Sequence, residues 1–464
     1  MRTTLLAASL TFALAGPLLA EGSPGAPPLP KDPGRVLDAY VHGPREGYRW
    51  AVQGERALGT VSVLDVELVS GMWRGRPWTH RLRVLVPPPA AGERARPGHA
   101  ILAITGSGRA EQLDAMLAPL AQQLGVPVAV LFDVPNQPLF QGEEGERGLR
   151  EDALIAKSFA EFARTGDAEW PLLLPMTRAA VAAMDALEAL SVERAKGPGW
   201  AHGKLEKFVT TGASKRGWTT WLTAAVDPRV IGIAPIVYDN LNIPAQIRRH
   251  FEVWGKPSPQ IHDYTDRGLL EMLRTERGQD LLCMVDPFSY VDRIRVPKMA
   301  LMGTNDTYWP LDAVNLYRGA LEGDFFCHYV PNAGHSAGVS VVGAIAGFFD
   351  HVTGRTPRLP EPSITVRPRK DATISVAGPL DRARVVAARV WSTSVAGRDF
   401  TKAQWEFIPA AAAGAAWRAD LPASVGAQRD GGAAFIGELE LRDSAGGSFK
   451  LHTPVQVWEL GPSN

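Results

Sequence analysis

Short apolar runs alternate with segments of helical periodicity between about residues 100 and 350. The apolar runs have the length of buried strands and lie at residues 100–105, 127–132, 207–211, 232–238, 298–303 and 325–330. Helical patterns separate them and cover residues 110–124, 151–164 and 176–191. Strands and helices in alternation predict an α/β fold with a mostly parallel sheet covered on both faces.

Three further segments depart from this alternation. Residues 241–292 are helical, aromatic and charged, and we expect them to form a lid inserted over the sheet. Three prolines at 357, 360 and 362 predict a stiff linker, and alternating runs beyond it predict a small β-sandwich-like domain over residues 360–464. The main domain then covers residues 35–355, and we expect the C-terminal domain to be separable and to supply no catalytic group.

The N-terminus has the pattern of a secretory signal peptide. Arg2 provides a short positive region, residues 5–19 are apolar and small, and Ala20 precedes Glu21. We therefore predict a signal peptide at residues 1–20 and a soluble mature protein in the periplasm or outside the cell. No later segment is long and apolar enough to cross a bilayer, so stable membrane insertion is not expected.

Composition excludes several classes of protein. The 49 basic and 49 acidic residues cancel, so no basic face for nucleic acid is expected. The two cysteines, Cys283 and Cys327, cannot build a disulfide framework, and whether they pair is left open. The ten histidines have no metal-ligand spacing, and Gly106 and Gly108 lack the third glycine of a dinucleotide fingerprint. We expect no metal and no cofactor. Oligomeric state is left open.

The strongest local signal is a Gly-x-Ser-x-x-Gly turn at Gly212, Ser214 and Gly217. A β-rich run precedes the turn and a helical stretch follows it, as in the nucleophile elbow of α/β-hydrolases. A sharp strand-to-helix turn lifts the serine above the sheet and points the positive end of the helix at the reacting centre. Ser214 is therefore the candidate nucleophile.

Two later residues complete a candidate catalytic triad. Asp306 follows the apolar run at 298–303, and His335 lies in a loop of small residues after the run at 325–330. The order serine, acid, histidine is that of α/β-hydrolases, in which each residue follows a strand. A serine needs such a base, and the base needs a carboxylate to orient it. For the oxyanion hole we expect the backbone N–H of Lys215 and one from Gly106 or Ser107.

Further residues are candidate contacts with the substrate. Arg216 and Trp218 follow the nucleophile, and Trp309 follows the acid. In the lid, apolar contacts are expected from Trp254, Tyr264 and Phe251, while Arg248, Arg249, His250 and His262 are candidate anchors for a carboxylate or sugar. Glu151, Asp152 and Asp185 lie in helical patterns and are interpreted as solvated or capping groups.

Several longer motifs resemble one known family. They are residues 134–139 (VPNQPL), 150–156 (REDALIA), 170–176 (WPLLLPM), 212–218 (GASKRGW), 242–246 (NIPAQ) and 285–290 (VDPFSY). Over residues 35–350 the sequence resembles the PhoPQ-activated pathogenicity-related proteins, although the loop around Asp306 departs from the Gly-Asp-Glu-Phe-Phe form of that family. The resemblance implies an exported α/β-hydrolase with a triad of Ser214, Asp306 and His335, and it names no substrate.

The function predicted is that of an exported serine hydrolase acting on an ester of a small molecule or saccharide. The elbow is also similar to that of glucuronoyl esterases, with Lys215 in place of an arginine, which would imply an acidic-sugar ester. Two alternatives stay open: a peptidase related to prolyl oligopeptidases, and a non-catalytic exported binding or signalling protein on a hydrolase fold.

Overall fold

A computed structural model describes residues 32–92, 95–145, 147–197, 200–336, 338–367, 369–377, 380–422, 425 and 431–459. The predicted signal peptide, residues 1–20, lies outside these ranges. Within them, no helix combines the length and the apolar character needed to cross a bilayer.

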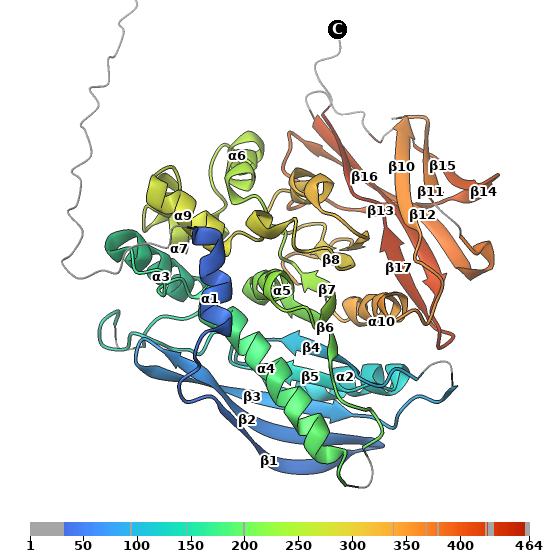
Figure 1. Cartoon of the computed structure of the whole chain (residues 1–464). Coiled ribbons are helices and arrows are strands. Elements are labelled where there is room, and N and C mark those ends of the chain that lie inside the picture. The colour runs from blue at the N-terminus through green and yellow to red at the C-terminus, as the bar shows by residue number, and fades with distance from the viewer. Residues whose placement is uncertain are drawn as a thin grey trace, which may run out of the picture.

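The central sheet runs through the whole molecule (Figure 1). Its first nine strands have the order β1-β2-β3-β5-β4-β6-β7-β8-β9, parallel from β5 to β9 and antiparallel at the β1–β3 edge. Their bounds are β1 (Arg49–Leu58), β2 (Val61–Trp73), β3 (Arg76–Val86), β4 (His99–Ile104), β5 (Val128–Leu131), β6 (Lys207–Ala213), β7 (Val230–Ile236), β8 (Lys298–Gly303) and β9 (Phe325–Val330). Each of the six predicted parallel strands is present.

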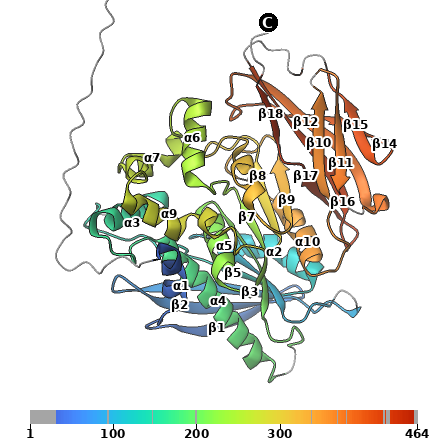
Figure 2. The ribbon, with the colours of Figure 1, turned by 45° about the horizontal axis from the view of Figure 1, so that its top comes forward.

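Helices cover both faces of this sheet and bury its side chains. Neighbouring strand residues point to opposite faces, so Phe208 of β6 belongs to one apolar core and Val209 to the other. One face carries α2 (Ala110–Leu124) and α10 (Ser340–Val352). The other face carries α1 (Val36–His42), α3 (Glu151–Thr165), α4 (Leu173–Arg194) and α5 (Lys215–Val226) (Figure 2). The α/β-hydrolase fold class is confirmed.

The C-terminal part forms two further sheet regions packed as a sandwich. A four-stranded sheet has the order β10-β11-β15-β14, with bounds β10 (Glu361–Arg367), β11 (Asp371–Ala377), β14 (Ala411–Ala413) and β15 (Ala416–Asp420). The facing strands are β12 (Val385–Ala396), β13 (Glu406–Pro409), β16 (Gly431–Arg442), β17 (Ser448–His452) and β18 (Gln456–Glu459). The small C-terminal β-sandwich expected from the alternating pattern is therefore present.

The sandwich is joined to the hydrolase sheet by strand pairing, and its separability stays a prediction. Strand β17 pairs antiparallel with β9, where His452 lies opposite Cys327, so the two sheets form one continuous sheet. The buried His452 also accepts a hydrogen bond from the backbone N–H of Tyr329 on β9 at 3.2 Å. Cys327 on β9 and Cys283 are both free thiols.

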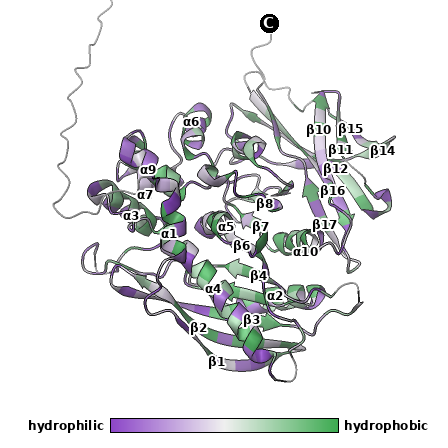
Figure 3. Cartoon of the chain, in the orientation of Figure 1, coloured by the Kyte–Doolittle hydropathy of each residue, from purple (hydrophilic) through white to green (hydrophobic). Residues whose placement is uncertain are grey.

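Residues 241–292 form the helical lid that the sequence predicts, between β7 and β8. It comprises α6 (Ile243–Trp254), α7 (His262–Thr265), α8 (Leu269–Met272), α9 (Glu276–Val285) and the short 3-10 helices η3 (Pro259–Ile261) and η4 (Pro287–Tyr290). These lid helices carry mixed polar and apolar faces, whereas α10 is mostly hydrophobic (Figure 3).

Candidate active site

Ser214 stands on the sharp turn between β6 and α5, as the sequence predicts. Its backbone has φ 57° and ψ −125°, a conformation that side chains rarely adopt and that marks a strained position. The turn closes only because two glycines flank it. A Cβ at Gly212 would lie 2.6 Å from the Arg216 carbonyl oxygen, and one at Gly217 would lie 2.8 Å from Cβ of Tyr238. Packing around the turn therefore holds the Ser214 backbone in this strained conformation.

Ser214, His335 and Asp306 form a hydrogen-bonded series. The His335 Nε2 atom lies 3.0 Å from Ser214 Oγ, and His335 Nδ1 lies 2.8 Å from Asp306 Oδ2. Asp306 Oδ1 accepts a further hydrogen bond from the backbone N–H of Tyr308 at 2.8 Å. The Tyr308 ring stacks on the His335 ring with 3.9 Å between their centroids. Each part of the histidine is thus held in place.

The loops that carry the acid and the histidine are connected to each other. The backbone N–H of Asn305 donates to the Ala333 carbonyl, and that of Asn332 donates to Thr304 Oγ1. Gly303 permits this approach, since a Cβ there would overlap the Gly334 carbonyl oxygen.

The C-terminal part supports the same two loops. Asn305 Nδ2 donates to the Ala403 carbonyl at 2.6 Å, and Asn332 exchanges two hydrogen bonds with the backbone of Trp405. The segment between β12 and β13 therefore braces the acid and histidine loops, a role that the sequence did not indicate.

The candidate oxyanion-hole residues surround the elbow. Strands β4 and β6 are paired with Ile104 opposite Gly212, so the loop beginning at Thr105 runs beside the nucleophile turn. Gly106 lies on this loop under the Arg216 guanidinium, which a Cβ at position 106 would overlap. Ser107 is exposed on the same loop, and Lys215 is the first residue of α5. Their role in stabilising an oxyanion stays a prediction.

Arg216 has a different role from the substrate contact that the sequence predicts. Its guanidinium donates to both carboxylate oxygens of Glu151, at 2.7 and 2.8 Å, and its Nε donates to the Val134 carbonyl. Because these donors are occupied by the protein, Arg216 joins the elbow, the Gly106 loop and the start of α3 instead of facing a substrate.

Glu151, interpreted from its helical position as a solvated or capping group, stays partly exposed but is bound on several sides by its own chain. Its backbone has φ 53°, and its backbone N–H and carboxylate both bind the Gln137 side chain. Burial would raise the pKa of Glu151, but the hydrogen bonds and charges of Arg216 and Lys215 hold that pKa well below its usual range. The carboxylate is thus ionised, and with Arg216 it forms a charged clamp behind the nucleophile.

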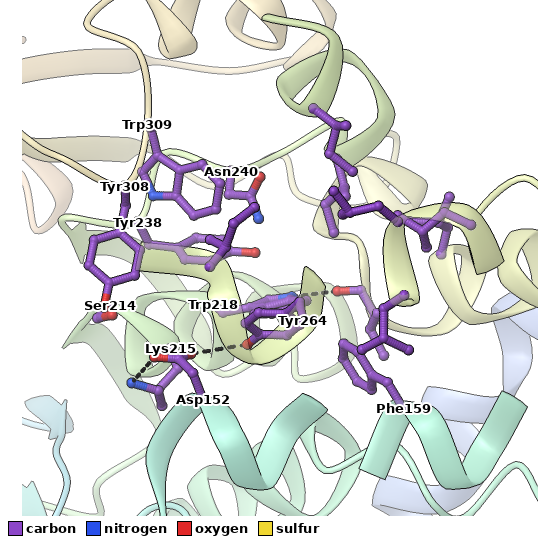
Figure 4. Close-up of a pocket in the computed structure, with 18 of the residues that line it drawn as sticks. Asp152, Phe159, Ser214, Lys215, Trp218, Tyr238, Asn240, Tyr264, Tyr308 and Trp309 are labelled. Carbon is purple, nitrogen blue, oxygen red and sulfur yellow. Dashed lines mark hydrogen bonds and ion pairs between the residues drawn. The ribbon is translucent and has the colours of Figure 1, made fainter. Parts of the chain in front are cut away.

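A pocket opens beside Ser214 and His335, beneath the lid. Its aromatic lining comes from Phe159, Trp218, Tyr238, Tyr264, Tyr308 and Trp309 (Figure 4). Trp218 and Trp309, both predicted as substrate contacts, therefore lie in the pocket wall. The lid contributes aliphatic side chains, namely Ile243, Ile247, Ile261, Leu269, Leu270, Met272, Leu273, Leu281, Leu282 and Val285.

One corner of the pocket is polar. Lys215 Nζ lies 3.1 Å from Asp152 Oδ2 and 2.9 Å from Glu151 Oε2, and the Tyr264 hydroxyl donates to Asp152 Oδ1 at 3.0 Å (Figure 4). The sequence placed Asp152 on a helix and interpreted it as a solvated or capping group. Its position in the motif at residues 150–156, directly after Glu151, is a signal that could have directed attention to it.

Three other predicted contacts lie outside this pocket. Arg248 is exposed on α6 and is absent from the lining. Trp254 donates its Nε1–H to Asp399 at 3.2 Å and packs on His250, on the side of α6 that faces the C-terminal part. Arg249 is bound by both carboxylate oxygens of Asp312. The lid thus offers aliphatic side chains to the site in place of the charged anchors expected.

Asp239 is a buried carboxyl group that the sequence did not indicate. It follows β7 and lines a small cavity together with Asp306 and Trp309. Its Oδ1 atom has no hydrogen-bond partner among the described residues. Burial, with an added contribution from the charge of Asp306, raises the pKa of Asp239 to about 7.

This pKa predicts a specific pH dependence of stability. A carboxyl group whose folded pKa lies above its unfolded value of about 3.9 stabilises the fold when protonated, and that contribution is lost as the pH rises towards 7. Relative to Asp239→Asn, the wild type should therefore lose on the order of a few kcal/mol of unfolding free energy between pH 5 and pH 8. Urea denaturation of both proteins at the two pH values measures this, and a difference that does not change with pH would contradict it.

In the described part of the chain, no three His, Cys, Asp or Glu side chains are grouped so that they could hold a metal ion.

Comparison with known proteins identifies relatives along most of the chain. The sequence model of the PhoPQ-activated pathogenicity-related proteins matches residues 37–401. Autocrine proliferation repressor protein A of Dictyostelium discoideum is 31% identical over 313 residues, which are 65% of this chain and 61% of that protein. The chain therefore spans about three fifths of the length of that curated relative.

Solved structures give more distant likenesses. The acetyl xylan esterase from Paenibacillus sp. R4 matches with a TM-score of 0.48 at 14% identity, covering 70% of this chain and 96% of that one. A puromycin-hydrolyzing peptidase of Mycobacterium tuberculosis matches with a TM-score of 0.39 at 18% identity, covering 68% of this chain and 50% of that one.

Proposed function

The chain belongs to the PhoPQ-activated pathogenicity-related protein family, and we propose that it is an exported serine hydrolase that cleaves esters through a covalent intermediate on Ser214. The observation that carries this proposal is the unbroken series from Ser214 Oγ through His335 to Asp306. Such a series on a strand-to-helix turn activates a serine that would otherwise be a weak nucleophile.

In the first half of the reaction, His335 Nε2 accepts the proton of Ser214 while Oγ forms a bond to the ester carbonyl carbon. The negative charge then develops on the carbonyl oxygen. The backbone N–H of Lys215, at the N-terminus of α5, and that of Gly106 or Ser107 are the donors proposed to stabilise it. His335 passes the proton to the leaving alcohol, and an acyl group remains bound to Ser214.

In the second half, water attacks the acyl-enzyme and transfers a proton to His335. The acid is released when that proton returns to Ser214 Oγ. Asp306 accepts the Nδ1–H of His335 throughout, which keeps Nε2 directed at the serine. The Tyr308 ring, stacked on the imidazole, covers one face of this histidine.

Export is the second part of the proposal. It rests on the short positive start, the apolar residues 5–19 and the small Ala20 before Glu21. The location proposed is the periplasm or the medium.

Substitution of the nucleophile tests the enzymatic part. Ser214→Ala should lower the turnover of p-nitrophenyl acetate by several orders of magnitude, because the whole triad acts as a unit. Ser363→Ala, an exposed serine on β10, is the matched control and should be unchanged. Amino-acid p-nitroanilides assayed beside the ester separate the esterase from the peptidase. Faster cleavage of the anilides would favour a peptidase, and equal activity of Ser214→Ala would refute the proposal.

A further inference from the structure

The pocket beside Ser214 has a chemical character that restricts the substrate. Two layers build it: a floor of aromatic rings from α3, α5 and the end of β7, and a roof of aliphatic side chains from the lid. In the floor, Trp218 stacks on Tyr238 with 5.4 Å between ring centroids, and Phe159 meets Trp218 edge to face. The lining also holds three polar atoms without a hydrogen-bond partner among the described residues, namely Tyr238 OH, Asn240 Oδ1 and Trp309 Nε1. The aromatic and aliphatic side chains of the two layers are otherwise uncharged.

The charges at the pocket are already balanced. Apart from His335, the formally charged side chains among the described lining residues are Asp152 and Lys215, which pair with each other. Just behind them, Glu151 pairs with Lys215 and Arg216. Two acids and two bases thus neutralise one another within the protein. A charged substrate group placed here would lose its hydration without gaining a partner, which is costly.

The roof of the pocket is fixed at both ends of the lid. The buried carboxylate of Asp286, which follows α9, accepts hydrogen bonds from the backbone N–H groups of Asn242 and Ile243 at the start of α6. It also accepts one from Phe288 at 2.9 Å. Trp218 in the floor donates its indole N–H to the Val285 carbonyl. The apolar roof is therefore tied to the floor around the same cavity.

From these observations we propose that the space beneath the lid binds an uncharged, apolar group of the substrate. This inference rests on the proposed function, and it names the substrate class as neutral esters with an extended alkyl or aromatic group. An acidic-sugar ester does not suit this lining.

The dependence of activity on the length of the substrate's acyl chain tests the inference. Each methylene buried in such a pocket strengthens binding about fourfold at most. We expect kcat/KM for p-nitrophenyl esters to rise about tenfold to a hundredfold from acetate to hexanoate. The p-nitrophenyl monoester of adipate, which matches hexanoate in length but ends in a carboxylate, should be at least a hundredfold worse than hexanoate. A second series, acetates of alcohols from ethyl to octyl, shows whether the apolar group lies on the acyl or the alcohol side.

Two matched substitutions on α6 assign the effect to the pocket. Ile247→Glu places a carboxylate in the lining and should lower kcat/KM for hexanoate at least tenfold more than for acetate. Phe251→Glu lies one helical turn further on, where the side chain is exposed and outside the lining, and should leave the ratio of the two esters unchanged. A fall of the ratio in both variants would contradict the assignment.

Covalent labelling separates failure of the inference from failure of the function. One outcome overturns the inference alone. In it, a fluorophosphonate labels Ser214, but the acetate, hexanoate and adipate esters react at equal rates and the alcohol series shows no dependence on length. The proposed hydrolase function then still stands. If the wild type neither reacts with the probe nor cleaves any ester, both are overturned. A steep rise in either neutral series with rejection of the adipate monoester supports the inference without depending on any variant.

Discussion

Asp306→Asn is expected to lower turnover by about 10⁴-fold while leaving the fold intact. The asparagine can still accept the Tyr308 backbone N–H, but its amide group would donate to His335 Nδ1 and place the ring proton on Nε2. A histidine in that tautomer cannot accept the proton of Ser214. Steady-state kinetics on a p-nitrophenyl ester, with far-UV circular dichroism as a folding check, measures the loss.

The matched control for that loss is Asp266→Asn, an exposed lid acid outside the pocket lining. It should retain wild-type turnover. Retention of activity by Asp306→Asn would remove Asp306 from the mechanism and leave His335 without its proposed orienting group.

The second large effect is expected at the clamp behind the nucleophile. Arg216→Met keeps the length of the side chain but removes the guanidinium that covers Gly106 and binds Glu151. Without it the Gly106 loop loses its support, and a misplaced oxyanion donor costs about 10²- to 10³-fold in kcat. KM should change little, because the guanidinium does not line the pocket.

Arg248→Met is the control for this prediction, since it removes an exposed arginine from the lid. It should leave kcat and KM unchanged. If Arg216→Met instead raised KM for acidic substrates and spared kcat, Arg216 would be a substrate anchor, as the sequence alone indicated, and the clamp would have no catalytic consequence.

The sequence predicted the central sheet and the proximity of Ser214, Asp306 and His335, for a common physical reason. Buried parallel strands are short, continuous apolar runs, and the residues directly after them meet at one edge of the sheet. Ser214, Asp306 and His335 each follow such a run, so their approach could be anticipated without side-chain geometry. The glycines at 212 and 217 marked the turn for the same local reason, lack of room for a Cβ.

Contacts between distant segments could not be predicted in this way. Arg216 and Glu151 are 65 residues apart, and nothing local distinguishes an arginine that binds a substrate from one that binds a carboxylate of its own chain. Asp286 and Asn242 are likewise 44 residues apart, although each lies in a motif that the sequence singled out. Such pairs appear only when the fold brings the two motifs together.

The continuation of the central sheet into the C-terminal strands could not be predicted, for a related reason. The alternating pattern of β17 and β16 is the same whether these strands form an isolated sandwich or extend a neighbouring sheet. The single opposed pair, Cys327 and His452, decides between the two, and it joins residues 125 positions apart. The support that Ala403 and Trp405 give to the acid and histidine loops follows from that junction.

Covalent labelling of Ser214 tests the central claim most directly. The protein is incubated with a fluorophosphonate, digested, and the modified peptide is sequenced by mass spectrometry, with Ser214→Ala as the paired sample. The account predicts one phosphonate adduct, on Ser214, and none in Ser214→Ala. An adduct on another serine, or equal labelling of the alanine variant, would contradict it.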